Sequence, residues 1–288
     1  MGAILEVRNL RKDFKDFSLK DISFSLEQGF IMGLIGPNGA GKSTTIKLIM
    51  NLLKKDGGEI KIFGLDHIKQ EKEIKDRIGF VYDENYFYEE LTISEMVRVI
   101  SPLYKNWNDN IYHKYRKEFD LSPKKKIKEL SKGMKMKFSL AIALSHQAEL
   151  LIMDEPTSGL DPLVRRELLE ILSEIVQDEN KGVFFSTHIT SDLDRIADYI
   201  VLLNNGEILL NTAKDDILDH YAIVKGDKKL LSQATRSHFI GIKENQFGFE
   251  GLIEDKKNIN RIFQKEVIIE KPNLEDIMYY FTRRDSNV

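Results

Sequence analysis

The sequence predicts an α/β fold built around a mostly parallel sheet. Several short apolar runs predict buried strands, and segments with helical periodicity separate them. A glycine-rich loop joins one of these strands, residues 30–35, to a following helix. Strands that alternate with helices pair in parallel through right-handed crossovers, so these observations favour a layered α/β protein.

Composition narrows the class further. The chain has 288 residues, 42% hydrophobic and 31% charged, a balance typical of a soluble globular protein with a sizeable core. Its net charge of −3 gives no general attraction to nucleic acid or anionic membrane. The lack of cysteine excludes disulfides and thiolate chemistry. Because no apolar run approaches the roughly 20 residues of a membrane span and no signal-peptide pattern begins the chain, we expect a cytoplasmic protein.

The N-terminal region is predicted to be rich in strands. Residues 3–9 and 21–26 alternate apolar and polar side chains, as half-buried strands do. The strand at 30–35 leads through the glycine-rich loop into a helix over 44–54. Two further short strands are predicted at 59–63 and 78–82.

The middle of the chain changes to a helical pattern and then returns to alternation. Between residues 84 and 147 we expect an inserted helical subdomain, with helices at 92–104, interrupted by Pro102, 109–119 and 132–145. The later elements are strands at 150–153 and 183–185, helices at 162–178 and 192–197, and a hairpin pairing 199–203 with 207–210.

After about residue 218 the pattern changes again. Strands are predicted at 221–225, 239–243 and 266–270, with helices at 228–234 and 257–263 between them. We therefore expect a main domain over residues 3–218 and a small α/β appendage over residues 219–288.

The glycine-rich loop matches G-x-x-x-x-G-K-[ST], the phosphate-binding loop. Its glycines allow backbone N–H groups to curl around phosphate oxygens, and the following helix N-terminus adds partial positive charge. Lys42 would reach the β- and γ-phosphates, and the Ser43 hydroxyl would bind Mg²⁺. The predicted nucleotide-binding residues of the loop are Gly36, Pro37, Asn38, Gly39, Ala40, Gly41, Lys42, Ser43 and Thr44.

Acidic residues follow the buried strand at 150–153. Asp154 lies where a carboxylate can hold Mg²⁺ through water, beside the phosphate loop. Glu155 is placed to act as a general base toward an attacking water. Taken alone, the same pattern also fits a strand that ends in an acidic turn.

Two further polar residues have alternative interpretations when they are read singly. Ser131 precedes a helix, where it fits a helix N-cap. His188 follows an apolar strand and either contacts a γ-phosphate or serves the structure alone.

Read together, these motifs resemble the nucleotide-binding subunits of ABC transporters over residues 3–215. The phosphate loop, the signature 130–134, the Asp154–Glu155 pair, the segment 158–161 and His188 occur in that family's order. The resemblance implies a P-loop NTPase core with a mostly parallel sheet, an antiparallel N-terminal β-subdomain, a helical subdomain insert and a small C-terminal α/β appendage.

The resemblance also implies roles for individual residues. Ser131, Lys132 and Gly133 would contact the ATP held by a second protomer, in a head-to-tail dimer with two ATP molecules. Asp161 would communicate between the two sites, and His188 would sense the γ-phosphate. ATP and Mg²⁺ are the expected cofactors, and the ATPase partner is either a second copy or a different ATPase chain.

This sequence departs from the family pattern at some positions. Asp83 stands where the family has a glutamine; it can still bind Mg²⁺ but cannot donate a hydrogen bond to water. The signature reads Ser-Lys-Gly-Met, which is similar to the ABC-2-type exporter branch that includes bacitracin-resistance-like and peptide-efflux systems. We expect Phe14 to stack on adenine, with Phe17 as the alternative.

The resemblance therefore implies an ATP-hydrolysing subunit that powers a separate membrane permease, exporting a peptide, antibiotic or lipid-like substrate from the cytoplasmic face. Residues 82–88 with 92–96 lie where the family docks its permease, although the same aromatic residues also suit core packing. The alternatives are a soluble ABC ATPase acting in nucleic-acid or translation processes, a nucleotide sensor and an importer ATPase. The chain has one phosphate loop and no long heptad insertion, which argues against a soluble ABC ATPase. The presence of Glu155 argues against a nucleotide sensor. No direct nucleic-acid partner is expected.

Overall fold

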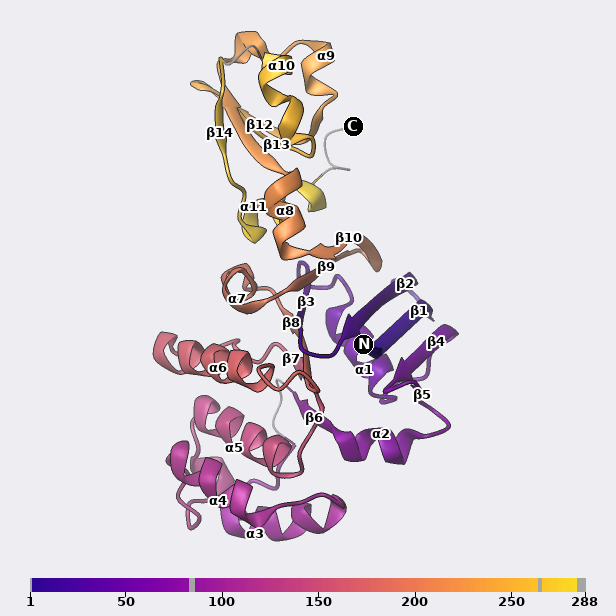
Figure 1. The fold of residues 1–288 in the computed structure, drawn as a ribbon, viewed down its shortest axis with the longest axis vertical. Coiled ribbons are helices and arrows are strands. Elements are labelled where there is room, and N and C mark those ends of the chain that lie inside the picture. The colour runs from indigo at the N-terminus through magenta and orange to yellow at the C-terminus, as the bar shows by residue number, and fades with distance from the viewer. Residues whose placement is uncertain (1, 83–85, 264–265, 284–288) are drawn as a thin grey trace.

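The computed structural model describes residues 2–82, 86–263 and 266–283. A central six-stranded sheet occupies the middle of the molecule, with a helical region at one end and a C-terminal sheet at the other (Figure 1). No helix within these ranges is long and apolar enough to cross a membrane.

The central sheet has the strand order β10-β9-β3-β8-β7-β6. All of its neighbours pair in parallel except β10, which is antiparallel to β9. Its strands are β3 (Ile31–Ile35), β6 (Ile78–Val81), β7 (Leu150–Asp154), β8 (Gly182–Thr187), β9 (Tyr199–Asn204) and β10 (Glu207–Ala213). The predicted parallel sheet and terminal hairpin are both present.

Both faces of this sheet are covered, which explains the continuous apolar runs of its strands. In β3, Ile31 and Ile35 belong to one hydrophobic cluster, whereas Met32 and Leu34 belong to the other. A strand that is buried on both sides carries no polar alternation. The same reason makes β7 and β8 entirely buried.

A second sheet, entirely antiparallel, has the order β2-β1-β4-β5. Its strands are β1 (Ala3–Asp13), β2 (Ser18–Glu27), β4 (Gly57–Ile62) and β5 (Leu65–Asp66). Strand β1 is longer than predicted because it continues past an irregularity: Asn9 has a φ of 48°, and the pairing shifts register between Val7 and Leu10. Such a bulge interrupts the two-residue alternation that marks a strand in sequence.

The helices that accompany the two sheets are α1 (Lys42–Ile49), α2 (Glu71–Arg77), α6 (Pro162–Ile175), α7 (Thr190–Ile196) and α8 (Lys214–His220). Helix α1 ends before residue 54, as Asn51 adopts a left-handed φ of 54°. Helices α2 and α8 were not predicted. Each buries a single residue, Ile74 and Ile217, so neither has the apolar periodicity that predicts a helix.

The helical region contains α3 (Ile93–Ile100), α4 (Asp109–Glu118) and α5 (Lys132–Ser145), with 3₁₀ turns η1 (Ser101–Leu103) and η2 (Ile127–Glu129). Thr92 and Glu95 form a capping box at the start of α3. Pro102 ends that helix by lying in η1, as predicted. The buried face of α5 packs against β6 of the central sheet.

The C-terminal region forms a four-stranded antiparallel sheet in the order β12-β13-β11-β14. Its elements are β11 (Ala222–Gly226), η3 (Lys228–Leu230), α9 (Gln233–Arg236), β12 (Phe239–Asn245), β13 (Gly248–Ile253), η4 (Lys256–Asn258), α10 (Ile259–Phe263), β14 (Ile268–Glu270) and α11 (Leu274–Thr282). The helix predicted over 228–234 is wrong, because Ser232 caps a separate short helix after η3. Strand β13 and helix α11 were missed.

Candidate nucleotide-binding site

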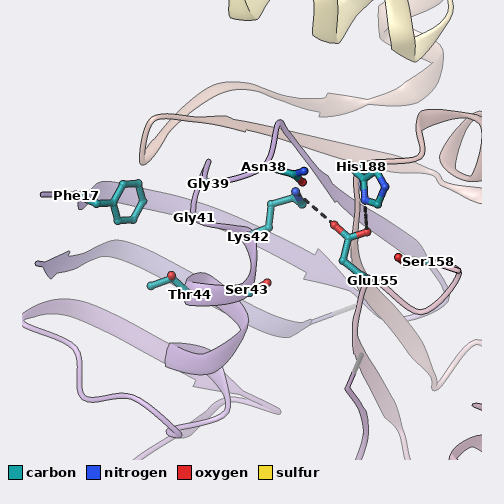
Figure 2. Close-up of a pocket in the computed structure, with 10 residues that line it drawn as sticks. All are labelled: Phe17, Asn38, Gly39, Gly41, Lys42, Ser43, Thr44, Glu155, Ser158 and His188. Carbon is teal, nitrogen blue, oxygen red and sulfur yellow. Dashed lines mark hydrogen bonds and ion pairs between the residues drawn. The ribbon is translucent and has the colours of Figure 1, made fainter. Parts of the chain in front are cut away.

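An open cavity of about 390 Å³ lies where the phosphate loop meets the ends of β7 and β8 (Figure 2). The carboxyl ends of parallel strands are where ligands bind in open α/β sheets. The residues that line the cavity are Phe17, Asn38, Gly39, Gly41, Lys42, Ser43, Thr44, Glu155, Ser158 and His188. Segments far apart in the sequence therefore meet at one place.

Close packing requires glycine at two positions of the loop, Gly36 and Gly41. A Cβ on Gly36 would lie 2.1 Å from the backbone oxygen of Leu203. Gly41 has a φ of +110°, and a Cβ there would lie 2.6 Å from the Leu19 side chain. Gly41 is also the N-cap of α1 and has no side chain to accept from the first-turn N–H groups, so these donors stay free of a side-chain cap.

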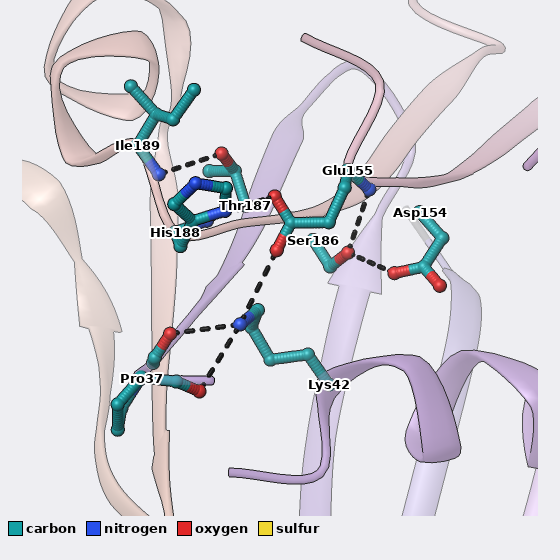
Figure 3. Close-up of polar contacts among 9 residues, drawn as sticks. Pro37, Lys42, Asp154, Glu155, Ser186, Thr187, His188 and Ile189 are labelled. Carbon is teal, nitrogen blue, oxygen red and sulfur yellow. Dashed lines mark hydrogen bonds and ion pairs between the residues drawn. The ribbon is translucent and has the colours of Figure 1, made fainter. Parts of the chain in front are cut away.

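Lys42 is buried and bridges the loop to Glu155. Its Nζ donates to the backbone oxygens of Gly36 at 2.9 Å and Pro37 at 3.3 Å, and lies 3.4 Å from Glu155 Oε1 (Figure 3). The side chain lines the cavity and is only 6% exposed. Its positive charge is therefore held beside the Glu155 carboxylate.

Glu155 is held in an uncommon backbone conformation, with a φ of 48°. Two hydrogen bonds to Ser186 hold this backbone in place: the Glu155 backbone N–H donates to the Ser186 backbone oxygen and to its Oγ, both at 3.1 Å. Its carboxylate accepts from the His188 N–H at 3.2 Å and lies 2.7 Å from His188 Nδ1. Glu155 therefore connects Lys42 on one side with His188 on the other.

Asp154 ends β7 as a buried carboxylate. It accepts a hydrogen bond from the Ser186 hydroxyl, so Ser186 supports both acidic residues (Figure 3). Ser43 lines the neighbouring cavity at the start of α1, and α1 packs against β7. In the part of the chain that the structure describes, no three His, Asp or Glu side chains form a metal cage. A hydroxyl with one carboxylate suits Mg²⁺, which keeps water and phosphate oxygens as its other ligands.

The predicted signature residues lie outside this cavity. Ser131 is the N-cap of α5, and its Oγ accepts from the Met134 N–H at 3.2 Å. Gly133 allows close approach of α5 and α6, since a Cβ there would lie 2.8 Å from Val164. Asp161 caps α6 by accepting from the N–H groups of Leu163 and Val164.

The aromatic side chain at the cavity is Phe17, the alternative of the two predicted residues. Phe17 lines the cavity and packs against the loop at Gly41. Phe14 does not line it and is 44% exposed, with its ring 6.2 Å from that of Phe17. Asp83 lies outside the described residues.

Two residues of the site were missed from the sequence. Ser158 lines the cavity and could have been found, because it begins the segment 158–161 already singled out. Ser186 carries no motif signal of its own; its role follows from the parallel pairing of β7 with β8, which places it opposite Asp154.

Comparison with known proteins agrees with this geometry. A family model described as ABC transporter matches residues 19–158. The bacitracin transport ATP-binding protein BcrA of Bacillus licheniformis is 34% identical over 214 residues, covering 73% of this chain and 69% of that protein. The linearmycin resistance ATP-binding protein LnrL of Bacillus subtilis is 34% identical over 220 residues, covering 74% and 70%.

A solved structure of the ATP binding subunit of an ABC transporter is 33% identical, with a TM-score of 0.69, covering 75% of this chain and 92% of that one. The P-loop NTPase fold predicted from the sequence is thereby confirmed. ATP hydrolysis is characteristic of this family, and its ATP-binding subunits dimerise and work with membrane permease subunits. This chain belongs to the ATP-binding, ATP-hydrolysing subunits of ABC transporters.

Proposed function

We propose that this ATPase drives export of a peptide, antibiotic or lipid-like compound through a separate membrane permease. The direction is supported by the names of its relatives, one a bacitracin transport and the other a linearmycin resistance protein. The chain would lie on the cytoplasmic face of the membrane, attached through that permease.

The observation that carries the hydrolytic role is the position of Glu155 between Lys42 and His188. A carboxylate fixed by two neighbours and lining the cavity is suited to accept a proton from an attacking water. Lys42 and the loop N–H groups would hold the phosphates, and His188 would contact the γ-phosphate from the opposite side. Bound Mg²⁺, held by Ser43 and Asp154, would supply charge neutralisation at the phosphates.

Phe17 is the better adenine platform, because it lines the cavity whereas Phe14 does not. An aromatic face stacks on any purine, so it adds affinity with little base selectivity. The main grip on the nucleotide would then be on its phosphates, which the loop provides.

The second protomer would complete the site. Ser131 and Gly133 at the start of α5, together with Asp161 at the start of α6, lie outside their own cavity and would face the ATP bound by a partner. ATP would hold the dimer together because its charge is satisfied only when both chains contribute donors. Pairing with a second copy and with a different ATPase both fit this arrangement.

In the aromatic segment 86–88, one side chain packs in the core and two are exposed, where a partner protein can contact them. Phe87 packs on Phe138, with ring centroids 4.9 Å apart, whereas Tyr86 and Tyr88 are 71% and 66% exposed. Beyond α2, Leu103 is also exposed and lines a cavity of about 580 Å³ between α2 and η1. We propose that a cytoplasmic segment of the permease covers these apolar side chains.

The direct test is drug resistance. Cells that express this chain with its permease should tolerate higher concentrations of membrane-active peptide antibiotics, and Lys42→Ala should remove that tolerance. If the intact pair leaves efflux unchanged but accelerates uptake of a labelled compound, the export proposal is wrong, while the ATPase assignment stands.

A further inference from the structure

An ion pair between a buried carboxylate and a partly exposed arginine, 28% exposed, joins the first turns of α6 and α7, outside the cavity. Arg165 Nε lies 2.5 Å from Asp192 Oδ1, and a second guanidinium nitrogen of Arg165 donates to Ser191 Oγ at 2.8 Å. The Asp192 side chain is 1% exposed. Its other oxygen, Oδ2, is buried with no hydrogen-bond partner among the described residues. Such a carboxylate depends on its one cation, because a buried charge without a partner is strongly unfavourable.

Each end of the pair is tied to a loop of the nucleotide site. The backbone N–H of Arg165 donates to the backbone oxygen of Asp161 at 2.9 Å, in the turn that Asp161 caps. The Asp192 N–H donates to the backbone oxygen of Ile189 at 3.2 Å, directly after His188. One backbone hydrogen bond therefore connects Arg165 to Asp161, and another connects Asp192 to the residue next to His188.

A second pair links the same two helices and gives a natural comparison. Arg195 lies 2.9 Å from Glu170, farther along both helices, and both side chains are solvent-exposed, at 41% and 51%. Exposed pairs of this kind contribute little, because water and salt screen them. If the only role of these ion pairs were to hold α6 against α7, removal of either pair should have a similar effect on the protein.

We propose that Arg165 and Asp192 are positioning residues for ATP hydrolysis. They would fix the turn after β8, which contains His188, relative to the turn before α6, which contains Asp161. They would transmit a change at the dimer-facing Asp161 to the residue that contacts the γ-phosphate, without touching the nucleotide themselves. The inference rests on the proposed roles of His188 and Asp161. A small displacement of a contacting group is enough to slow a reaction strongly.

The test compares Asp192→Asn with Glu170→Gln in the full chain. Asp192→Asn keeps the shape but removes the charge, and we expect kcat for Mg-ATP to fall about tenfold or more with KM changed less than about threefold. Glu170→Gln should leave kcat unchanged. Arg165→Lys keeps the charge but loses the forked contact, and an intermediate loss of kcat is expected; it also provides a milder variant if Asp192→Asn melts early.

Coupling to His188 separates positioning from general stability. If the pair acts through His188, then Asp192→Asn should add nothing to the loss caused by His188→Ala. Additive losses, equal losses in Asp192→Asn and Glu170→Gln, or wild-type kcat in both Asp192→Asn and Arg165→Lys would each overturn the proposal. Wild-type hydrolysis by His188→Ala alone would instead refute the proposed role of His188.

Discussion

The two sides of the nucleotide cavity are built in different ways. The phosphate loop is shaped by backbone: Gly36 and Gly41 leave no room for a side chain, and Lys42 bonds to carbonyls of its own loop. The opposite side is shaped by side chains from separate strands, where Ser186 supports Asp154 and Glu155, and Glu155 meets His188. Where the backbone packs closely, as in the loop, few residue types are tolerated. Where side chains form the contacts, one substitution can remove a single contact and leave the others in place.

The comparison predicts the largest effect for a change in the loop backbone. Gly41→Val should weaken ATP binding about a hundredfold, because a β-branched residue at a φ of +110° is strained by about 3 kcal/mol and its Cβ would clash with Leu19. Binding of a fluorescent ATP analogue measures this. Gly64→Ala is the control: Gly64 also has a positive φ, +76°, but a Cβ there would meet nothing within 4 Å and Gly64 does not line the cavity, so the affinity should not change. Equal affinities for the ATP analogue in the wild type, Gly41→Val and Gly64→Ala would show that the loop does not require glycine at position 41.

A smaller effect is expected on the side built by side chains. Ser186→Ala removes one support from Asp154 and one from Glu155, and should lower kcat about tenfold while ATP affinity stays within about threefold. Steady-state hydrolysis and nucleotide titration separate the two quantities. Ser173→Ala is matched, since Ser173 bonds only to a carbonyl of its own helix. A loss of affinity with unchanged kcat would place Ser186 with the loop instead.

The aromatic position should have a modest effect. Phe17→Ala should raise the KM for ATP about fivefold or more, given ~1–3 kcal/mol for one base stacked on an aromatic ring. Phe14→Ala should leave KM unchanged, because Phe14 does not line the cavity. The reverse result would restore Phe14 as the adenine platform.

His146 lies outside both sides of the cavity, and we expect it to affect the pH dependence of stability and to leave ATP turnover at neutral pH unchanged. Burial lowers the pKa of His146 from its ordinary value of 6.5 to about 4. Between these values the unfolded chain binds a proton that the folded chain does not. This contribution to stability is therefore complete above pH 6.5, and about 3 kcal/mol is lost as the pH falls to 4.

His146→Phe should flatten this acid dependence while keeping a ring next to Tyr104, whose centroid is 3.8 Å from that of His146. Urea unfolding of both proteins at pH 7 and pH 4 measures the difference. If the wild type and the variant lose the same free energy of unfolding on acidification, then His146 does not titrate in this way.

The same contrast explains what the sequence could predict. The loop, the acidic pair and His188 lie in contiguous motifs, so their residues and the parallel sheet around them were predictable. Ser186, Arg165 and Asp192 make contacts between segments far apart in the chain, and only the pairing of strands and helices places them. In the C-terminal region, strand β13 has Gly248 and Gly251 within it, which weakens the strand pattern.

The full chain with Glu155→Gln, assayed with Mg-ATP, shows whether Glu155 is the general base. We predict that ATP still binds, that hydrolysis falls at least about a hundredfold, and that the bound nucleotide holds two chains together as a dimer in size-exclusion chromatography. Hydrolysis at the wild-type rate would contradict this prediction, because Glu155 could not then be the general base.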